Sequence, residues 1–264
     1  MSVSALHSAR PVLSRGPVRE QVTAAEWQAR VDLAACYRLV HHYGMDEMVA
    51  NHISVRVPGE EGTFLLNPYG LLYDQITASC FVKVDESGKI LFDPTGLGAN
   101  KAGFVIHSAV HMARHDVDCV IHTHTLAGMA VSAMECGVLP IAQSSMRFID
   151  IGTHDFEGPA LHLDERARLV ADLGMREVMI LRNHGLLATG ASIAEAFNNI
   201  FRLERACQLQ VMALSCNTKL SMPSDAAVAA TNALFMPTGE RRRGLLEWPA
   251  LLKRLDRIDP SYRE

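Results

Sequence analysis

Two histidines spaced two residues apart, at the end of an apolar run, limit what this chain can fold into more than any other feature. Cys119, Val120 and Ile121 favour a strand, and His122 and His124 stand at its end. Alternate side chains of a strand share a face, so both imidazoles project to one side with Cα atoms about 6–7 Å apart. That geometry suits two ligands of one divalent metal, whose Zn–N bonds are about 2.0–2.1 Å long. The alternative is that the two histidines are capping or core residues.

A second apolar run, residues 177–181, supplies a third histidine. We expect this run to form another strand, and it is followed closely by His184 and Gly185. Two strand ends that carry three histidines favour the metal interpretation over the capping one. The sequence therefore predicts a metal triad of His122, His124 and His184, with Gly185 letting the backbone turn away.

The composition indicates a soluble α/β protein without a nucleic-acid partner. A chain of 264 residues, 48% of them hydrophobic, can bury a sizeable core as one large domain or two small ones. A net charge of −4 at pH 7 gives no basic field for nucleic acid. The cysteines form no CxxC pair, which is typical of reduced thiols. No apolar stretch reaches the roughly 18 residues of a membrane span, and we see no signal-peptide core. We expect a cytoplasmic protein with no membrane partner.

Helical and strand periods alternate along most of the chain. Thr23 and Glu26 fit a capping box that opens a helix, and Phe81–Val84 and Lys89–Phe92 read as a hairpin. Further helices are expected at 100–114, 126–135, up to Gly174 and from Ser192 to about Ser215, and further strands at 53–57 and 63–66. A mixed sheet with helices on both sides fits this pattern.

Three segments are expected. Residues 1–22 form a flexible N-terminal arm, 23–218 the domain, and 219–264 a C-terminal tail that packs on the domain or on a neighbouring subunit. After Lys219 the regular pattern fades, apart from a weak helical segment near 248–255.

Five motifs between about residues 25 and 215 carry a family resemblance. They are Asn51-His-Ile-Ser-Val-Arg56, Phe64-Leu-Leu-Asn-Pro-Tyr-Gly-Leu-Leu-Tyr73, Ile76-Thr-Ala-Ser79, the His122-Thr-His124 strand and Ile180-Leu-Arg-Asn-His-Gly185. Together they resemble the class II aldolase/adducin family. Lys101-Ala-Gly-Phe104 and Val131-Ser-Ala-Met134 look nearer to the adducin head than to the sugar-phosphate aldolases.

The resemblance implies both a fold and a metal. The fold is a three-layer α/β/α class II aldolase-like domain with a central mixed, largely antiparallel sheet, commonly a homotetramer with active sites between subunits. The metal is Zn²⁺ on His122, His124 and His184, with Mn²⁺ or Co²⁺ as alternatives because imidazole suits several divalent ions.

The resemblance also suggests site residues. Tyr262 matches a tyrosine that family aldolases carry on a C-terminal tail, and it is a candidate proton donor. The positions of the family's phosphate pocket are Asn51, Tyr69, Gly70 and Lys101 here, and Lys101 could pair with an anion. With Asn51, His52 is expected to line the cleft as a hydrogen-bonding group.

One departure from the family weakens the expectation of aldolase activity. Family aldolases carry a glutamate about four residues before the histidine that corresponds to His107, and this chain has Gly103 there. His107 is then the better candidate for a proton donor, or for a group that orients a ligand. His111 and His115 are expected on a partly exposed helix surface.

Two functional classes follow. The first is a divalent-metal-dependent lyase, of aldolase or decarboxylase type, that cleaves a C–C bond in a small oxygenated acid or carbonyl compound through a metal-stabilised enolate. The second is a non-catalytic, adducin-like interaction or cytoskeletal-type module. The three retained histidines favour the lyase, because converging imidazoles without a partner are costly when they are buried.

Overall fold

The central feature is an eight-stranded sheet with the strand order β4-β3-β2-β1-β5-β8-β7-β6. The computed structural model describes residues 16–158, 165–236 and 242–264. All neighbouring strands pair antiparallel except β6 and β7, which are parallel. The strands are β1 (His52–Arg56), β2 (Thr63–Leu66), β3 (Val82–Asp85), β4 (Ile90–Phe92), β5 (Cys119–Thr123), β6 (Gly152–His154), β7 (Val178–Leu181) and β8 (Gly185–Gly190).

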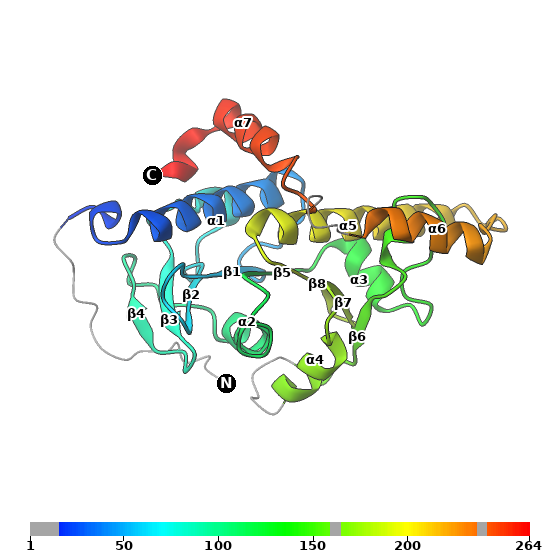
Figure 1. Ribbon diagram of the computed structural model, residues 1–264, viewed down its shortest axis with the longest axis horizontal. Coiled ribbons are helices and arrows are strands. Elements are labelled where there is room, and N and C mark those ends of the chain that lie inside the picture. The colour runs from blue at the N-terminus through cyan, green and yellow to red at the C-terminus, as the bar shows by residue number, and fades with distance from the viewer. Residues whose placement is uncertain (1–15, 159–164, 237–241) are drawn as a thin grey trace.

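Helices cover both faces of this sheet (Figure 1). Helices α1 and α5 lie over one face and α2 and α4 over the other, while α7 packs outside α1. The bounds are α1 (Ala24–His42), α2 (Lys101–Ala113), α3 (Leu126–Ser132), α4 (Glu165–Leu173), α5 (Ile193–Ser215), α6 (Asp225–Phe235) and α7 (Trp248–Ile258). The expected three-layer α/β/α fold with a mixed, largely antiparallel sheet is confirmed.

The two faces of the sheet hold separate cores, and this fixes where each histidine points. Ile53 and Ile121 belong to the larger core under α1 and α5. Val120 belongs to the core under α2 and α4. Because side chains alternate along a strand, His122 lies on the α2 face together with Val120. The pairing of His52 with His122 across β1 and β5 puts both imidazoles on that face.

The first helix begins as expected, but its capping box is only half formed. The side chain of Thr23 accepts a hydrogen bond from the backbone N–H of Glu26. The Glu26 carboxylate does not return to Thr23; it is buried and pairs with Arg30 and Lys83 instead. Two cations within reach bind a carboxylate more strongly than one backbone amide does, so the ion pairs prevail.

Three elements were missed in the sequence. Strand β8 is buried along its whole length and therefore shows no alternation of polar and apolar residues. Strand β6 has three residues, too few for a periodic signal. Helix α6 is capped by Ser224 but buries none of its residues, so it has no single apolar stripe. The division of the chain at 218/219 stays a prediction.

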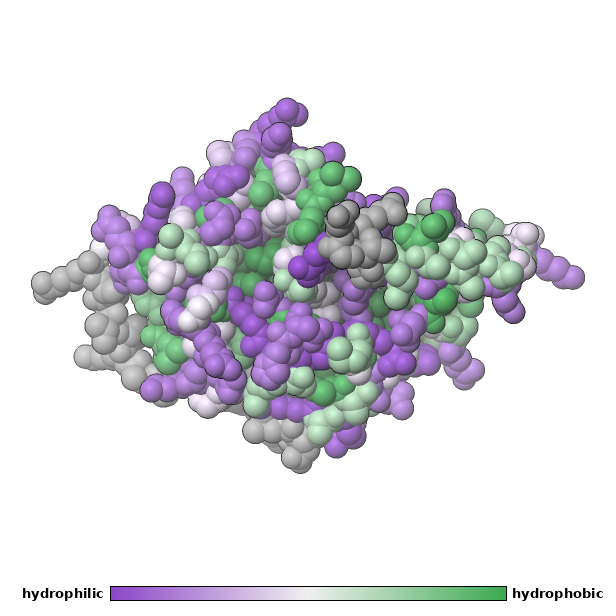
Figure 2. Space-filling model, viewed as in Figure 1, coloured by the Kyte–Doolittle hydropathy of each residue, from purple (hydrophilic) through white to green (hydrophobic). Residues whose placement is uncertain are grey.

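Helix α6 and the second half of α5 project from one end of the molecule. Figure 2 shows this end as a pale green, apolar surface. Its large exposed side chains include Met212, Leu234 and Met236, with Leu234 70% exposed. Exposed apolar surface of this kind is typical of regions that contact another molecule. No described helix is long and apolar enough to cross a membrane.

Candidate metal centre

Three imidazoles converge at the end of β5, as the sequence predicted. Nε2 of His122 lies 2.7 Å from Nε2 of His124 and 3.2 Å from Nε2 of His184. One ring nitrogen from each of the three histidines lies within 4.8 Å of the other two. Among the described residues, this is the one cluster of histidine, cysteine or acidic side chains close enough together to hold a metal ion. A tetrahedral ion with Zn–N bonds of about 2.0–2.1 Å separates its ligand nitrogens by about 3.3 Å. The cluster therefore has the dimensions of a divalent metal site.

Outer hydrogen bonds turn the lone pairs of two of these rings toward one another. Nδ1 of His122 lies 2.9 Å from the backbone oxygen of Leu186, which can only accept, so Nδ1 carries the proton. Nδ1 of His124 donates in the same way to the carboxylate of Glu47, at 2.7 Å. Both Nε2 atoms then present lone pairs at close range, which is repulsive unless a cation lies between them. Metal-binding histidines have this arrangement, with the second nitrogen bonded to a carbonyl or carboxylate.

Burial keeps two of the ligands neutral. It lowers the pKa of His122 well below its usual value, and the neighbouring imidazoles of His52, His184 and His124 add to the effect. Burial, followed by the nearby His124, lowers the pKa of His184 to about 4. At neutral pH these nitrogens hold no proton that a metal would have to displace.

The turn that delivers His184 differs from the expected one. Its left-handed residue is Asn183, with φ of 53°, and not Gly185. Gly185 lies at the start of β8, where a Cβ would come 2.4 Å from the backbone oxygen of Thr123. The glycine is therefore needed for close approach of β8 to β5, which brings His184 beside the other ligands.

A second group of histidines lies behind the first, on the face covered by α2. Nδ1 of His52 is 2.8 Å from Nε2 of His107, whose Nδ1 is 2.6 Å from Oγ of Ser54. Ser54 is also 2.8 Å from Nε2 of His111. Because both ring nitrogens of His107 are engaged, it can reach a ligand only through His52.

The expected exposure of His111 is wrong, whereas His115 is exposed as expected. His111 is fully buried, and its ring stacks on Phe64 with centroids 4.7 Å apart. The helix face that carries it packs directly on β1 and β2. Ser54 was missed because a serine within a strand gives no chemical signal in the sequence.

His52 occupies the space in front of Gly103. A Cβ built on Gly103 would lie 2.7 Å from both Cγ and Cδ2 of His52. The rings of His52 and His122 have centroids 5.0 Å apart, so His52 lies beside the metal ligands. Where the family aldolases carry a glutamate, this chain thus has Gly103 on α2 and, in front of it, the imidazole of His52 from strand β1.

The other predicted substrate residues lie in two places: Asn51 just before β1, and Tyr69, Gly70 and Lys101 around the start of α2. Asn51 is fully buried, and among the described residues neither polar atom of its side chain has a hydrogen-bond partner. The backbone N–H of Tyr69 donates to the carbonyl oxygen of Gly98, which places Tyr69 and Gly70 near the start of α2. The backbone of Lys101 begins α2, but its side chain lies outside the described residues.

Tyr262 is placed away from the histidine cluster within this chain. It lies on a short 3-10 helix, Pro260–Arg263, that packs against α1, on the opposite side of the sheet from α2. The side chain is buried, and its hydroxyl donates to Asp256 at 2.8 Å. Burial, followed by the hydrogen bond to Asp256, raises the pKa of this phenol. The C-terminal end is thus attached to the domain and is not a free tail.

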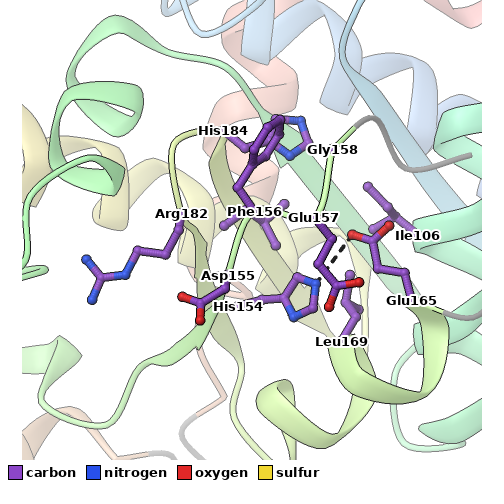
Figure 3. A pocket seen from close by; sticks show the side chains of 11 residues that line it. Ile106, His154, Asp155, Phe156, Glu157, Gly158, Glu165, Leu169, Arg182 and His184 are labelled. Carbon is purple, nitrogen blue, oxygen red and sulfur yellow. Dashed lines mark hydrogen bonds and ion pairs between the residues drawn. The ribbon is translucent and has the colours of Figure 1, made fainter.

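A small pocket opens beside His184 (Figure 3). Phe156 borders it with a ring centroid 6.3 Å from that of His184. On its floor His154, which no sequence spacing singled out, is buried and pairs with Asp172 and Glu165. Apolar and acidic side chains that line this pocket therefore lie beside the histidine cluster.

Comparisons with known proteins agree with this site and fold. The family model described as Class II Aldolase and Adducin N-terminal domain matches residues 31–211. Mouse alpha-adducin is 46% identical over 188 residues, which cover 70% of this chain and 26% of adducin. A crystal structure of an aldolase II superfamily protein from Pseudomonas syringae has a TM-score of 0.89 at 47% identity, covering 94% of this chain and all of that one. L-fuculose 1-phosphate aldolase from Glaciozyma antarctica has a TM-score of 0.81 at 26% identity, covering 91% and 94%.

The chain therefore belongs to the class II aldolase and adducin family, as the motifs predicted. Class II aldolases depend on a divalent metal, and this chain keeps a three-histidine cluster of the right dimensions. Glu47, which holds His124, was missed in the sequence. An acidic residue in the loop after α1 has no spacing relation to a histidine far along the chain.

Proposed function

We propose that this protein is a divalent-metal-dependent lyase that cleaves a C–C bond in a small oxygenated acid or carbonyl compound. The observation that carries the proposal is the convergence of three Nε2 atoms, two of them in tautomers fixed by Leu186 and Glu47. Such a set fits Zn²⁺, and Mn²⁺ or Co²⁺ as alternatives. The similarity to L-fuculose 1-phosphate aldolase supports the same class of reaction.

A bound divalent ion supplies a Lewis acid that stabilises negative charge on a carbonyl or enolate oxygen. The protein residues then have separate roles. His122, His124 and His184 hold the ion, and Asn51, just before β1, has two polar atoms without a partner among the described residues. His52, hydrogen-bonded to His107, lies beside His122 at the place where family aldolases use a glutamate. Gly103 cannot exchange a proton, so a decarboxylase, which needs only a proton donor to the carbanion, fits this chain better than an aldolase.

The second candidate function is a non-catalytic, adducin-like interaction module. The glycine at position 103 and the 46% identity to mouse alpha-adducin favour it. In a module that binds no metal, three buried or half-buried imidazoles with converging lone pairs would be unfavourable. We therefore place it second.

Elemental analysis decides between the two candidates. The protein is purified without chelator or a histidine tag, offered zinc, manganese and cobalt, and compared with His184→Ala. We expect one ion per chain in the wild type and none in the variant. His115→Ala, which removes an exposed histidine outside the cluster, is the matched control and keeps the ion. A wild type without metal would favour the adducin-like module, and an unchanged metal content in His184→Ala would refute the ligand assignment.

We also propose a homotetramer with sites at subunit interfaces. The support is the apolar surface of α6, whose residues are all unburied within one chain. Light scattering should give a mass of about four times 29.0 kDa. A monomer at micromolar concentration would contradict this assembly.

A further inference from the structure

Four side chains form a buried, hydrogen-bonded chain that ends beside the metal ligands. It runs from His111 through Ser54 and His107 to His52, with donor–acceptor separations of 2.8, 2.6 and 2.8 Å. Each of the four residues is at most 3% exposed. No described carboxylate takes part in this chain. Burial without a carboxylate partner disfavours the charged form of imidazole, so the three rings are neutral at pH 7.

A neutral imidazole has one N–H and one lone pair, so fixing one ring fixes the others. Burial lowers the pKa of His111, and the nearby backbone carbonyl of Val117, which favours an N–H on this ring, opposes part of that shift. Nε2 of His111 is bonded to Ser54, so Nδ1 is the nitrogen left to carry an N–H, and we assign the N–H to it; among the described residues Nδ1 forms no hydrogen bond.

The remaining directions follow in sequence. Nε2 of His111 accepts from the hydroxyl of Ser54, and Ser54 accepts from Nδ1–H of His107. Nε2 of His107 then accepts from Nδ1–H of His52. The Nε2 atom of His52 is left with a lone pair, at the ring edge away from His107. Among the described residues it has no hydrogen-bond partner.

We propose that His52 is a hydrogen-bond acceptor for a hydroxyl of the ligand in the metal cleft, and that His107, Ser54 and His111 are positioning residues that hold it in this tautomer. The proposal rests on the proposed metal site. The ring takes the volume that a side chain at position 103 would fill, and it lies 5.0 Å from the ring of His122. It is therefore within reach of a ligand bound at the triad. The ligand it favours has a hydroxyl next to the metal-binding group, as a 2-hydroxy acid does.

The tautomer is measured first, by NMR of protein labelled with ¹⁵N-histidine, with His52 assigned from the signal lost in His52→Phe. We expect Nδ1–H and a bare Nε2 on His52. The variant His111→Phe keeps a ring against Phe64 but removes the acceptor for Ser54, and His52 should then populate both tautomers. Ser54→Ala tests the same link with a smaller change. A wild-type His52 that carries its proton on Nε2 would overturn the proposal.

Ligand binding is measured second, on zinc-loaded protein by calorimetry. Glycolohydroxamate and acetohydroxamate bind a metal through the same group and differ by one hydroxyl. One neutral hydrogen bond should make the hydroxylated probe bind roughly fivefold more tightly to the wild type. The preference should disappear in His52→Phe and persist in His115→Ala.

The two measurements separate this inference from the proposed function. If the hydroxyl preference is unchanged in His52→Phe while zinc stays bound, the inference fails and the metal site stands. If the wild type retains no zinc, the proposed function fails, and the NMR result alone decides whether the chain fixes the tautomer of His52.

Discussion

Replacing Gly103 by alanine tests whether His52 really fills the space in front of that glycine. Glycine-to-alanine changes in helices usually stabilise, and in the first turn of α2 the gain should be roughly 0.5 kcal/mol. Here the new Cβ would lie 2.7 Å from Cγ and Cδ2 of His52 and 3.2 Å from its Cβ. These atoms belong to the fixed base of the ring, whose Nδ1 is bonded to His107. Overpacking of this kind costs about 1–3 kcal/mol, and a lost hydrogen bond costs about 1 kcal/mol more.

We therefore expect Gly103→Ala to lower the free energy of unfolding by about 1.5–3.5 kcal/mol, against the helix propensity. In the His52→Ala background the same change should cost much less, because the two 2.7 Å contacts with Cγ and Cδ2 are gone and only the 3.2 Å contact with Cβ remains. Urea denaturation of the wild type, both single variants and the double variant gives the coupling free energy between the two positions. An equal effect of Gly103→Ala in both backgrounds, or a stabilisation of the wild type, would refute the steric reasoning.

Three further predictions concern separate contacts. Glu47→Ala should weaken zinc binding by roughly 10–100-fold, because it removes the partner that orients His124. The melting temperature of the metal-free protein should stay nearly unchanged. Competition with a chelator measures the zinc affinity, and an unchanged affinity would contradict the prediction. Burial lowers the pKa of His111 to about 3. Below about pH 6.5 the unfolded chain therefore binds a proton that the folded chain lacks. The free energy of unfolding then decreases as the pH falls, by up to about 1.4 kcal/mol per pH unit. In His111→Phe that slope should be shallower by this amount in urea titrations between about pH 7 and about pH 5, and parallel curves would disprove the assignment. Tyr262→Phe should cost about 1 kcal/mol through the lost bond to Asp256, with metal content unaffected; a loss of bound metal would instead connect Tyr262 to the site.

The sequence by itself determined the family, the order of most elements and the three histidines that converge in the candidate metal centre. His122 and His124 are two residues apart on a strand, and the alternation of side chains alone places them on one face. His184 could be added because it follows a second apolar run. Helices 24–42 and 193–215 were readable because their apolar residues recur at helical spacing and their caps are local.

Only the tertiary structure decided what lies around these ligands. The partners Glu47 and Leu186 reach the triad across long stretches of chain, and no local pattern encodes such contacts. The apposition of Gly103 and His52 depends on how α2 packs on β1, to within about the width of a methyl group. Local rules describe spacing along one element, whereas the direction of a buried hydrogen-bonded chain depends on every element that encloses it. For that reason the sequence could name His52, but only the fold could place its ring beside that of His122.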